Sequence, residues 1–377
     1  MKIYFDNAAT TPASPGAIEA ATQMSSIHYG NPSALHGMGL DAERLLKAAA
    51  EQAASALGCC ATEVVFTSGG TEANNLALLG CARARRRIGS HILTSAAEHP
   101  SVAKAADELE GEGFTVTRLT PDNRGILSPD EAAQAVRPDT VLASFVHVNN
   151  ETGSANDAPA LAEAVKRANP SVAVHFDGAQ AFCKTRVSLK NIDLYSVSAH
   201  KIHGVKGTGA LFARSGVRLV PLLYGGGQQN GVRPGTENTP GIAAFARAIS
   251  EALPAIEKNA RNARNIKNIL LSLTTSMDGV FVNGGGEGSS PFILNMSFLG
   301  VKAEVLVRAL EGKGIYISTG AACSSRRKGE NHLKWLGLDA KRSESAVRFS
   351  FSGQNTEDEA RICMKALAET VAELRRI

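Results

Sequence analysis

A lysine stands where an apolar stretch of the chain ends. Residues 194–198 read Leu-Tyr-Ser-Val-Ser, and Ala199, His200 and Lys201 follow them directly, shortly before Gly204. A lysine fixed at the mouth of a strand suits a Schiff base with an aldehyde cofactor, because burial and nearby cations lower the pKa of its amine. A surface lysine that simply follows a strand would fit the same residues, so other parts of the chain must decide.

Two further motifs suggest where such a cofactor would bind. Asp177 follows the apolar stretch 172–176, and a carboxylate buried there needs a cationic partner such as a protonated pyridine nitrogen. Ser68-Gly69-Gly70-Thr71 interrupts a β-prone stretch just before a helical one. A strand, a glycine turn and a helix N-terminus together favour anion binding, phosphate included. The less specific alternatives are an aspartate that caps a turn and a turn that binds no ligand.

His99 and Arg348 are candidates of a different kind. His99 precedes Pro100, so its backbone is expected to be extended. Its imidazole could stack on a cofactor ring or move a proton, although a purely structural histidine is the common alternative. Arg348 interrupts an apolar strand pattern, where a guanidinium suits bidentate binding of a carboxylate. The alternative for Arg348 is an edge-strand arginine that faces water.

Cys323 differs from the other cysteines in its surroundings. Small residues precede it, and Ser-Ser-Arg-Arg-Lys-Gly follows, so we expect an exposed loop whose cations favour the nucleophilic thiolate. The sequence has six cysteines and no Cys-x-x-Cys pair, which is too sparse for a disulfide framework. The others are expected to be mostly small core residues: Cys59, Cys60, Cys81, Cys183 and Cys363.

Alternating strands and helices must position these residues. Strands are expected at residues 63–67, 91–94, 116–119, 141–148, 172–176, 194–198 and 209–213, with helices at 41–57, from about 73, 101–109 and 158–168. This alternation predicts an α/β fold with a largely parallel sheet covered by helices. Ligands bind beyond the carboxyl ends of such strands. The candidates that follow expected strands are Thr71, His99, Asn150, Asp177, Gln180, Ser198, His200 and Lys201.

Length and composition favour a two-domain protein without a membrane span. The 377 residues exceed what one core usually serves. A helical region at about 240–274, kinked at Pro254, looks like the bridge to a second part with shorter strands. A net charge of +4 does not indicate nucleic-acid or membrane binding. No apolar run approaches the roughly 20 residues of a membrane span, and an acid near the N-terminus argues against a signal peptide, so we expect a cytoplasmic protein.

Taken together, these motifs resemble the cysteine desulfurases of the NifS/IscS type, within the class V aminotransferase family of fold-type-I pyridoxal-phosphate enzymes. The resemblance covers nearly the whole chain and includes stretches 4–11, 30–33, 67–75, 98–99, 147–153, 175–180, 198–201, 233–236, 320–323 and 348–350. It implies a large domain, 15–250, with a mainly parallel seven-stranded sheet flanked by helices. Residues 1–14 and 251–377 would form a smaller α+β domain that carries the catalytic cysteine loop.

The resemblance also implies roles for single residues. Lys201 would bind pyridoxal 5'-phosphate and move the Cα proton, with His99 stacked on the ring. Asp177 would pair with the pyridine nitrogen and Gln180 with the ring hydroxyl. The phosphate would be held by Thr71, Ser198 and His200, with Gly70 in the cofactor-binding turn and Thr236 reaching in from a second subunit of a homodimer. Asn150 belongs to both the cofactor-binding and the substrate-binding sets, and the substrate carboxylate would meet Asn7, Asn150 and Arg348. No metal is implied.

The activity implied is removal of sulfur from L-cysteine, giving L-alanine and a persulfide on Cys323. The sulfur would pass to an acceptor protein, either an iron–sulfur cluster scaffold or a tRNA-thiolation enzyme. The basic residues after Cys323, and an end at Ile377 without the extension that some members use to bind a scaffold, leave that acceptor open. The alternatives are a selenocysteine lyase or a class V aminotransferase on the same scaffold, or a cofactor-binding protein without catalysis.

Overall fold

The computed structural model describes residues 1–286, 288–319 and 333–376. The expected loop around Cys323 lies outside the described residues. No helix in the described part of the chain has the length and apolar character needed to cross a membrane.

A seven-stranded sheet forms the larger part of the molecule, with strand order β2-β8-β7-β6-β5-β3-β4. Five neighbouring strands, from β7 to β4, run parallel, and β8 is antiparallel to both of its neighbours. The strands are β2 (Val64–Thr67), β3 (His91–Ser95), β4 (Thr115–Leu119), β5 (Thr140–Val146), β6 (Ala173–Asp177), β7 (Leu194–Ser198) and β8 (Gly209–Ala213). This arrangement confirms the expected mainly parallel α/β sheet.

Helices cover both faces of this sheet, which explains why β5, β6 and β7 are buried along their whole length. One apolar core joins the sheet to α2 (Gly37–Leu57), α6 (Pro129–Ala135), α7 (Ala158–Ala168) and α8 (Thr239–Ala252). The other face packs on α5 (Pro100–Gly111) and on a continuous helical stretch made of α3 (Gly70–Asn75), the π-helix η2 (Leu76–Gly80) and α4 (Cys81–Arg85). Short 3-10 turns η1 (Ala61–Glu63), η3 (Ala199–Lys201) and η4 (Gln228–Gly231) complete this part.

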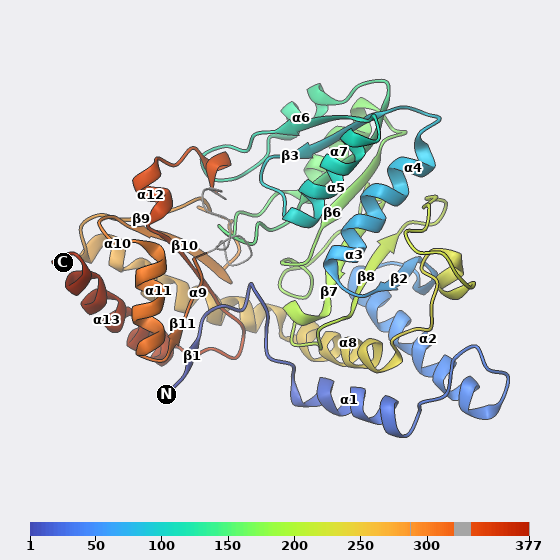
Figure 1. Cartoon of the computed structure of the whole chain (residues 1–377), viewed down its shortest axis with the longest axis horizontal. Helices are drawn as coiled ribbons and strands as arrows, with labels where there is room; N and C mark the ends of the chain where they lie inside the picture. Colours follow the sequence, from blue (N-terminus) through green and yellow to red (C-terminus); the bar gives the residue numbers. More distant parts are fainter. Residues whose placement is uncertain (287, 320–332, 377) are drawn as a thin grey trace.

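The C-terminal part forms a separate core on the left of Figure 1. Its sheets are an antiparallel one of order β12-β10-β9 and a parallel pair, β1 with β11. The strands are β1 (Ile3–Tyr4), β9 (Val280–Val282), β10 (Ile293–Phe298), β11 (Ile315–Tyr316) and β12 (Ala346–Ser350). The helices are α9 (Ile256–Leu271), α10 (Leu273–Ser276), α11 (Ala303–Gly312), η6 (Lys334–Leu336), α12 (Ala340–Glu344) and α13 (Glu357–Leu374).

Two connections join the cores. The helical bridge bends at η5 (Leu253–Ala255), which contains Pro254, as the sequence predicts. The N-terminal segment is the second connection: β1 belongs to the C-terminal core, and the chain then crosses to α1 (Pro15–Ser26), which packs on α8. The sequence reading did not include α1, whose buried residues are only Ala17 and Met24.

Candidate active site

A glycine turn opens the helical stretch that begins at α3. Gly69 has φ 151°, a conformation that side chains rarely allow. The hydroxyl of Ser198, at the end of β7, is buried and has no hydrogen-bond partner among the residues that the structure describes. A methyl group added at Gly70 would lie 3.5 Å from the Cβ of Ser198, so the turn and this hydroxyl face one another. Free N–H groups and an unpaired hydroxyl fit an anion such as a phosphate.

Thr71 and His99 share one pocket. Both line a hollow of about 470 Å³ between α3 and α5. The side chain of Thr71 is exposed, while burial lowers the pKa of His99 below its usual value. His99 is the N-cap of α5, and its Nδ1 accepts from the backbone N–H of Ser101 at 3.2 Å. The expected extended backbone before Pro100 is present, with ψ 147°.

Asp177 ends β6 and is buried, as expected. One of its oxygens accepts from the N–H of Ala179 at 3.0 Å, and the other accepts from the amide of Asn74 at 2.7 Å. Asp177 forms no ion pair within the described part of the chain. A buried carboxylate that meets only neutral donors suits a cationic ring nitrogen as an additional partner.

Lys201 lies in η3, against the N-terminal segment. Its Nζ donates to the carbonyl oxygens of Ala8 at 2.5 Å and Ala9 at 2.8 Å. The same segment contacts His200, whose Nδ1 lies 3.1 Å from the hydroxyl of Thr10. Burial and the nearby charge of Lys201 lower the pKa of His200 to about 4. The N-terminal segment therefore approaches Lys201 through its backbone carbonyl groups.

Gln180 links the N-terminal segment to Lys184, a residue that was not predicted from the sequence. Its Nε2 donates to the oxygen of Ala8 at 2.8 Å, and its Oε1 accepts from Nζ of Lys184 at 2.9 Å. Burial, with the like charges of Lys201 and Arg348, lowers the pKa of Lys184 to about 7. The sequence offers one hint of this contact, the four-residue spacing of Gln180 and Lys184, which would bring the two side chains together on a helix. The hint is weak because the residues after Asp177 form a turn.

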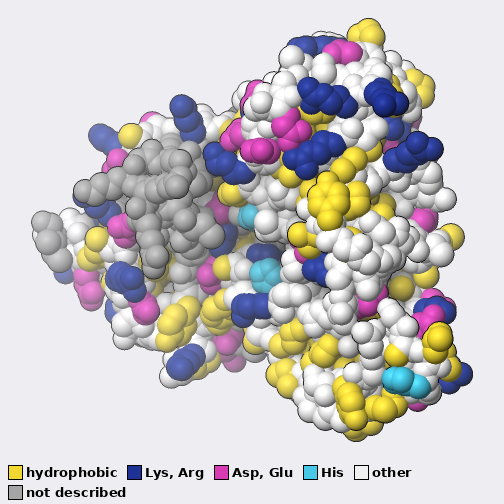
Figure 2. Space-filling model, turned by 45° about the vertical axis from the view of Figure 1, so that its right-hand side comes forward, with side chains coloured by type: hydrophobic (Ala, Val, Ile, Leu, Met, Phe, Trp, Pro, Cys, Tyr) yellow, Lys and Arg dark blue, Asp and Glu magenta, His cyan; other side chains and the backbone are white. Residues whose placement is uncertain are grey.

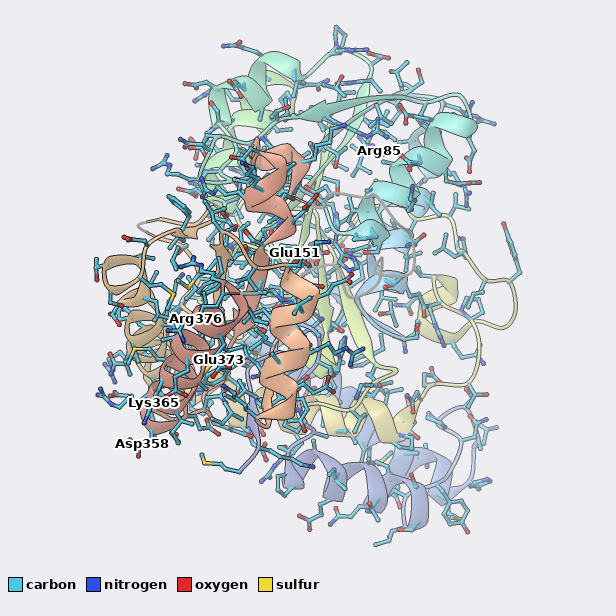
Figure 3. All side chains as sticks on the ribbon, turned by 60° about the vertical axis from the view of Figure 1, so that its left-hand side comes forward. Arg85, Glu151, Asp358, Lys365, Glu373 and Arg376 are labelled. Atoms are coloured by element: carbon cyan, nitrogen blue, oxygen red, sulfur yellow. The ribbon has the colours of Figure 1, made fainter. Side chains whose placement is uncertain are left out.

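Arg348 is buried in β12, so the alternative of an edge arginine facing water is wrong. Its guanidinium forms ion pairs with Asp6 at 2.9 Å and with Glu151 at 3.0 Å, and it also donates to the carbonyl of Asn150. The amide of Asn150 donates to Glu151 at 2.6 Å. Glu151 lies toward the middle of the molecule in Figure 3, and burial raises its pKa. The sequence reading missed both carboxylates.

Three other candidates stand apart from this cluster. The amide of Asn7 is occupied by the carbonyl oxygens of Tyr4 and Ser350 and by Asn355. Thr236 is exposed on the loop before α8 and, in the described contacts, does not hydrogen-bond to the residues above. Cys323 lies outside the described residues. The roles expected for these three stay predictions.

Comparison with known proteins gives a consistent answer. The family model described as Aminotransferase class-V matches residues 3–362. The chain belongs to the class-V aminotransferase family. "Putative cysteine desulfurase IscS 1" of Bacillus subtilis (strain 168) is 37% identical over 378 residues, which cover 99% of each chain.

Solved structures agree with this assignment. A structure titled "NIFS-LIKE PROTEIN" aligns with a TM-score of 0.93 and 33% identity, covering 99% of this chain and 100% of the other. Another, "SspA in complex with cysteine", aligns with a TM-score of 0.82 and 33% identity, covering 93% and 99%. The fold is therefore that of the NifS-like enzymes of fold type I.

Proposed function

We propose that this protein is a pyridoxal-phosphate-dependent cysteine desulfurase that converts L-cysteine to L-alanine and carries the sulfur as a persulfide on Cys323. One observation carries the proposal: a lysine, a buried carboxylate and a glycine turn lie at the same edge of one sheet. Within the described part of the chain, that carboxylate forms no ion pair and the hydroxyl facing the turn has no hydrogen-bond partner. The similarity to relatives named cysteine desulfurase supports it. The solved relative in complex with cysteine supports the choice of substrate.

Each residue near the sheet edge has a defined task in this proposal. Gly70, Thr71, Ser198 and His200 hold the phosphate, Asp177 the ring nitrogen, Gln180 the ring hydroxyl and His99 a ring face. Once bound through Lys201, pyridoxal phosphate supplies an electron sink that eases proton loss from Cα. Asn7, Asn150 and Arg348 orient the substrate through its carboxylate, which fixes the Cα proton within reach of Lys201.

Sulfur transfer requires the thiolate of Cys323. The thiolate attacks the substrate sulfur, so an S–S bond forms as the C–S bond breaks. The electron pair of that bond returns to the substrate, which takes up a proton and leaves as alanine. The enzyme keeps the sulfur as a persulfide until an acceptor thiol takes it. The acceptor belongs either to an iron–sulfur scaffold or to tRNA thiolation.

The deciding experiment removes the proposed nucleophile. Cys323→Ala is expected to lower alanine and sulfide production from L-cysteine, assayed with a reductant, by at least about 100-fold. The visible absorption band of the bound cofactor should be retained. Cys60→Ala is the control, because Cys60 is an exposed free thiol with no role in the proposal, and it should keep full activity.

Equal activity of Cys323→Ala and the wild type would contradict persulfide chemistry. The same scaffold would then point to a class V aminotransferase or a lyase that needs no protein thiol, and assays with selenocysteine and with keto acids would separate these. A purified protein without the visible band would contradict the cofactor itself.

We also propose a homodimer and a two-domain division at residues 15–250 against 1–14 and 251–377. Large apolar side chains are exposed on α1, α2 and the segment between them, including Ile27, Tyr29 and Leu35 at 96% exposure. Figure 2 shows hydrophobic side chains gathered on the lower part of the face that it presents. A second copy would cover this surface and bring Thr236 to its partner's phosphate site. Light scattering on the purified protein would test it, and a monomer would contradict it.

A cytoplasmic location completes the proposal. The five cysteines that the structure describes are free thiols. Free thiols fit a reducing compartment.

A further inference from the structure

A chain of hydrogen bonds joins the buried carboxylate of Asp177 to the imidazole of His99. The amide of Asn74 donates to Asp177 at 2.7 Å and to the hydroxyl of Ser101 at 2.8 Å. That hydroxyl lies 2.8 Å from Nδ1 of His99. The chain starts on α3, reaches the end of β6 and crosses to α5.

The direction of each bond follows from the chemistry of its groups. An ionised carboxylate only accepts, so the Asn74 atom beside Asp177 must be its NH₂ group. The second proton of the same NH₂ points to Ser101, whose oxygen therefore accepts. The hydroxyl proton of Ser101 is then available for Nδ1 of His99. The backbone N–H of Ser101 also donates to this nitrogen, at 3.2 Å.

We propose that Asn74 and Ser101 are positioning residues that hold His99 as the neutral tautomer protonated on Nε2. This inference rests on the proposed function for its meaning in catalysis, although the tautomer itself does not depend on turnover. An Nδ1 that receives two donors has no proton of its own, so the proton of a neutral ring must be on Nε2.

Two further observations agree with this assignment. The oxygen of Asn74 is buried and meets no donor in the described ranges of the chain, while the NH₂ group of the same side chain makes two hydrogen bonds. A buried orphan acceptor carries a cost, which is explained if the donors are what the site needs. Burial also lowers the pKa of His99, which favours the neutral ring; the charge of Asp177 opposes this shift and that of Lys201 adds to it.

The consequence concerns the direction of proton transfer. A ring that begins with its proton on Nε2 can donate there, and it cannot take up a proton at that nitrogen before it has released one. The neutral ring of His99 would therefore act as a hydrogen-bond donor through Nε2, with Lys201 left as the base.

The test is the protonation pattern of the ring nitrogens, measured by NMR on the cofactor-loaded protein with ring-¹⁵N histidine and no L-cysteine. The signals of His99 are assigned by their loss in His99→Gln, among nine histidines. We expect an unprotonated Nδ1 and a protonated Nε2 between about pH 6.5 and 8, the range that lies above the lowered pKa of His99. A protonated Nδ1 in the wild type would overturn the proposal.

Variants of Ser101 and Asn74 test whether these side chains set the tautomer of His99 or only stabilise the fold. Ser101→Ala leaves only the weaker backbone N–H as a donor to Nδ1, and Asn74→Leu frees the hydroxyl of Ser101 to accept, so both should increase the share of the Nδ1-protonated tautomer. Ser101→Thr should keep the wild-type pattern because it keeps the hydroxyl. In Ser101→Ala, kcat for the proposed desulfuration should fall about tenfold with KM within about twofold. An unchanged tautomer in Ser101→Ala would refute the role of its hydroxyl.

Ser144→Ala is the matched control, because Ser144 bonds Nδ1 of another buried histidine, His175, at 2.8 Å. It should shift the signals of His175 and leave those of His99 unchanged. Failure of desulfuration in the wild type would leave the tautomer result intact, so the two proposals can fail separately.

Discussion

Arg348 is held between two carboxylates in the interior of the protein, and this local charge balance governs what the site can bind. One guanidinium faces both Asp6 and Glu151, so the cluster as described carries a surplus of negative charge. Under the proposed function a substrate carboxylate must replace one of these partners or bind while Glu151 is protonated. Burial raises the pKa of Glu151, which favours the protonated form.

Removal of this guanidinium should therefore cost more than removal of one carboxylate charge. We expect Arg348→Met to lower the free energy of unfolding by about 3–5 kcal/mol at pH 7.5, because it leaves the half-buried carboxylates of Asp6 and Glu151 without their guanidinium partner. Glu151→Gln should cost only about 1–2 kcal/mol, because Asp6 remains and the amide oxygen can still accept. Urea unfolding measures both values.

The loss of stability in Arg348→Met should depend on pH. Without Arg348 the folded-state pKa of Glu151 rises further, so its protonated form is the stable one in the fold. Stability linked to a raised pKa is present at low pH and is lost as the pH rises through that pKa. The deficit of Arg348→Met should thus shrink from pH 7.5 toward pH 5. A constant deficit would mean that lost packing, and not charge, explains the effect.

Single residues show both the reach and the limit of sequence reasoning. Lys201, Asp177 and Arg348 were predictable because each interrupts or ends an apolar strand pattern. Asp6 and Glu151 were not, because they stand 342 and 197 positions from Arg348, and no local spacing links them. The same holds for Asn74, which lies 103 positions from Asp177.

Among the elements, the turn between β2 and α3 contributes space as well as N–H groups. A methyl group at Gly70 would make only ordinary contacts, 3.5 Å to Ser198 and 3.8 Å to Ala179, so the backbone should accept alanine. The methyl group would nevertheless fill the volume proposed for the phosphate.

Gly70→Ala is accordingly expected to fold normally and to bind pyridoxal phosphate about tenfold or more weakly. Cofactor retained after dialysis, read by visible absorbance, is the measurement. Gly111→Ala is the control, since its methyl group would meet nothing within 4 Å. Unweakened binding in Gly70→Ala would move the phosphate site elsewhere.

Elements with a strong apolar pattern were predicted closely from the sequence. The strands at 194–198 and 209–213 and the helix at 158–168 match the observed bounds. These segments are buried along one face or throughout, so tertiary packing agrees with their local preference. In contrast, α1 buries only two side chains and leaves Ile18 53% exposed, which weakens the periodic signal.

At the scale of the whole molecule, residues of both parts line an open pocket of about 860 Å³. Lys184 and Lys267 both line this pocket. Burial lowers the pKa of Lys267 to about 8. The pKa of Lys184, lowered from 10.5 to about 7, means that the folded state resists its protonation. Charge on Lys184 therefore opposes folding.

Lys184→Met should consequently raise the free energy of unfolding, by about 1–3 kcal/mol at pH 6.5 after allowance for its partial exposure and its lost bond to Gln180. Below pH 7 Lys184 is charged in the folded wild type, and the full cost of burying that charge lowers its stability. Above pH 7 the folded protein releases this proton and the cost falls, so the stability gained by Lys184→Met should diminish toward pH 10. Lys365→Met, at the exposed α13 position seen in Figure 3, is the control. A gain that is independent of pH would contradict the assigned cause.

The contacts of the N-terminal segment affect when the surroundings of Lys201 can form during protein synthesis. The oxygens of Ala8 and Ala9 that face Lys201 are carried by a segment whose neighbour Asp6 pairs with Arg348, and Asn7 bonds to Ser350. A ribosome needs roughly 20–70 s to pass from residue 6 to residue 348 at about 5–20 residues per second. The large sheet can be complete well before then. The lysine therefore gains its final surroundings only when the last strand emerges, so a nascent chain would hold a folded sheet and an unfinished catalytic centre.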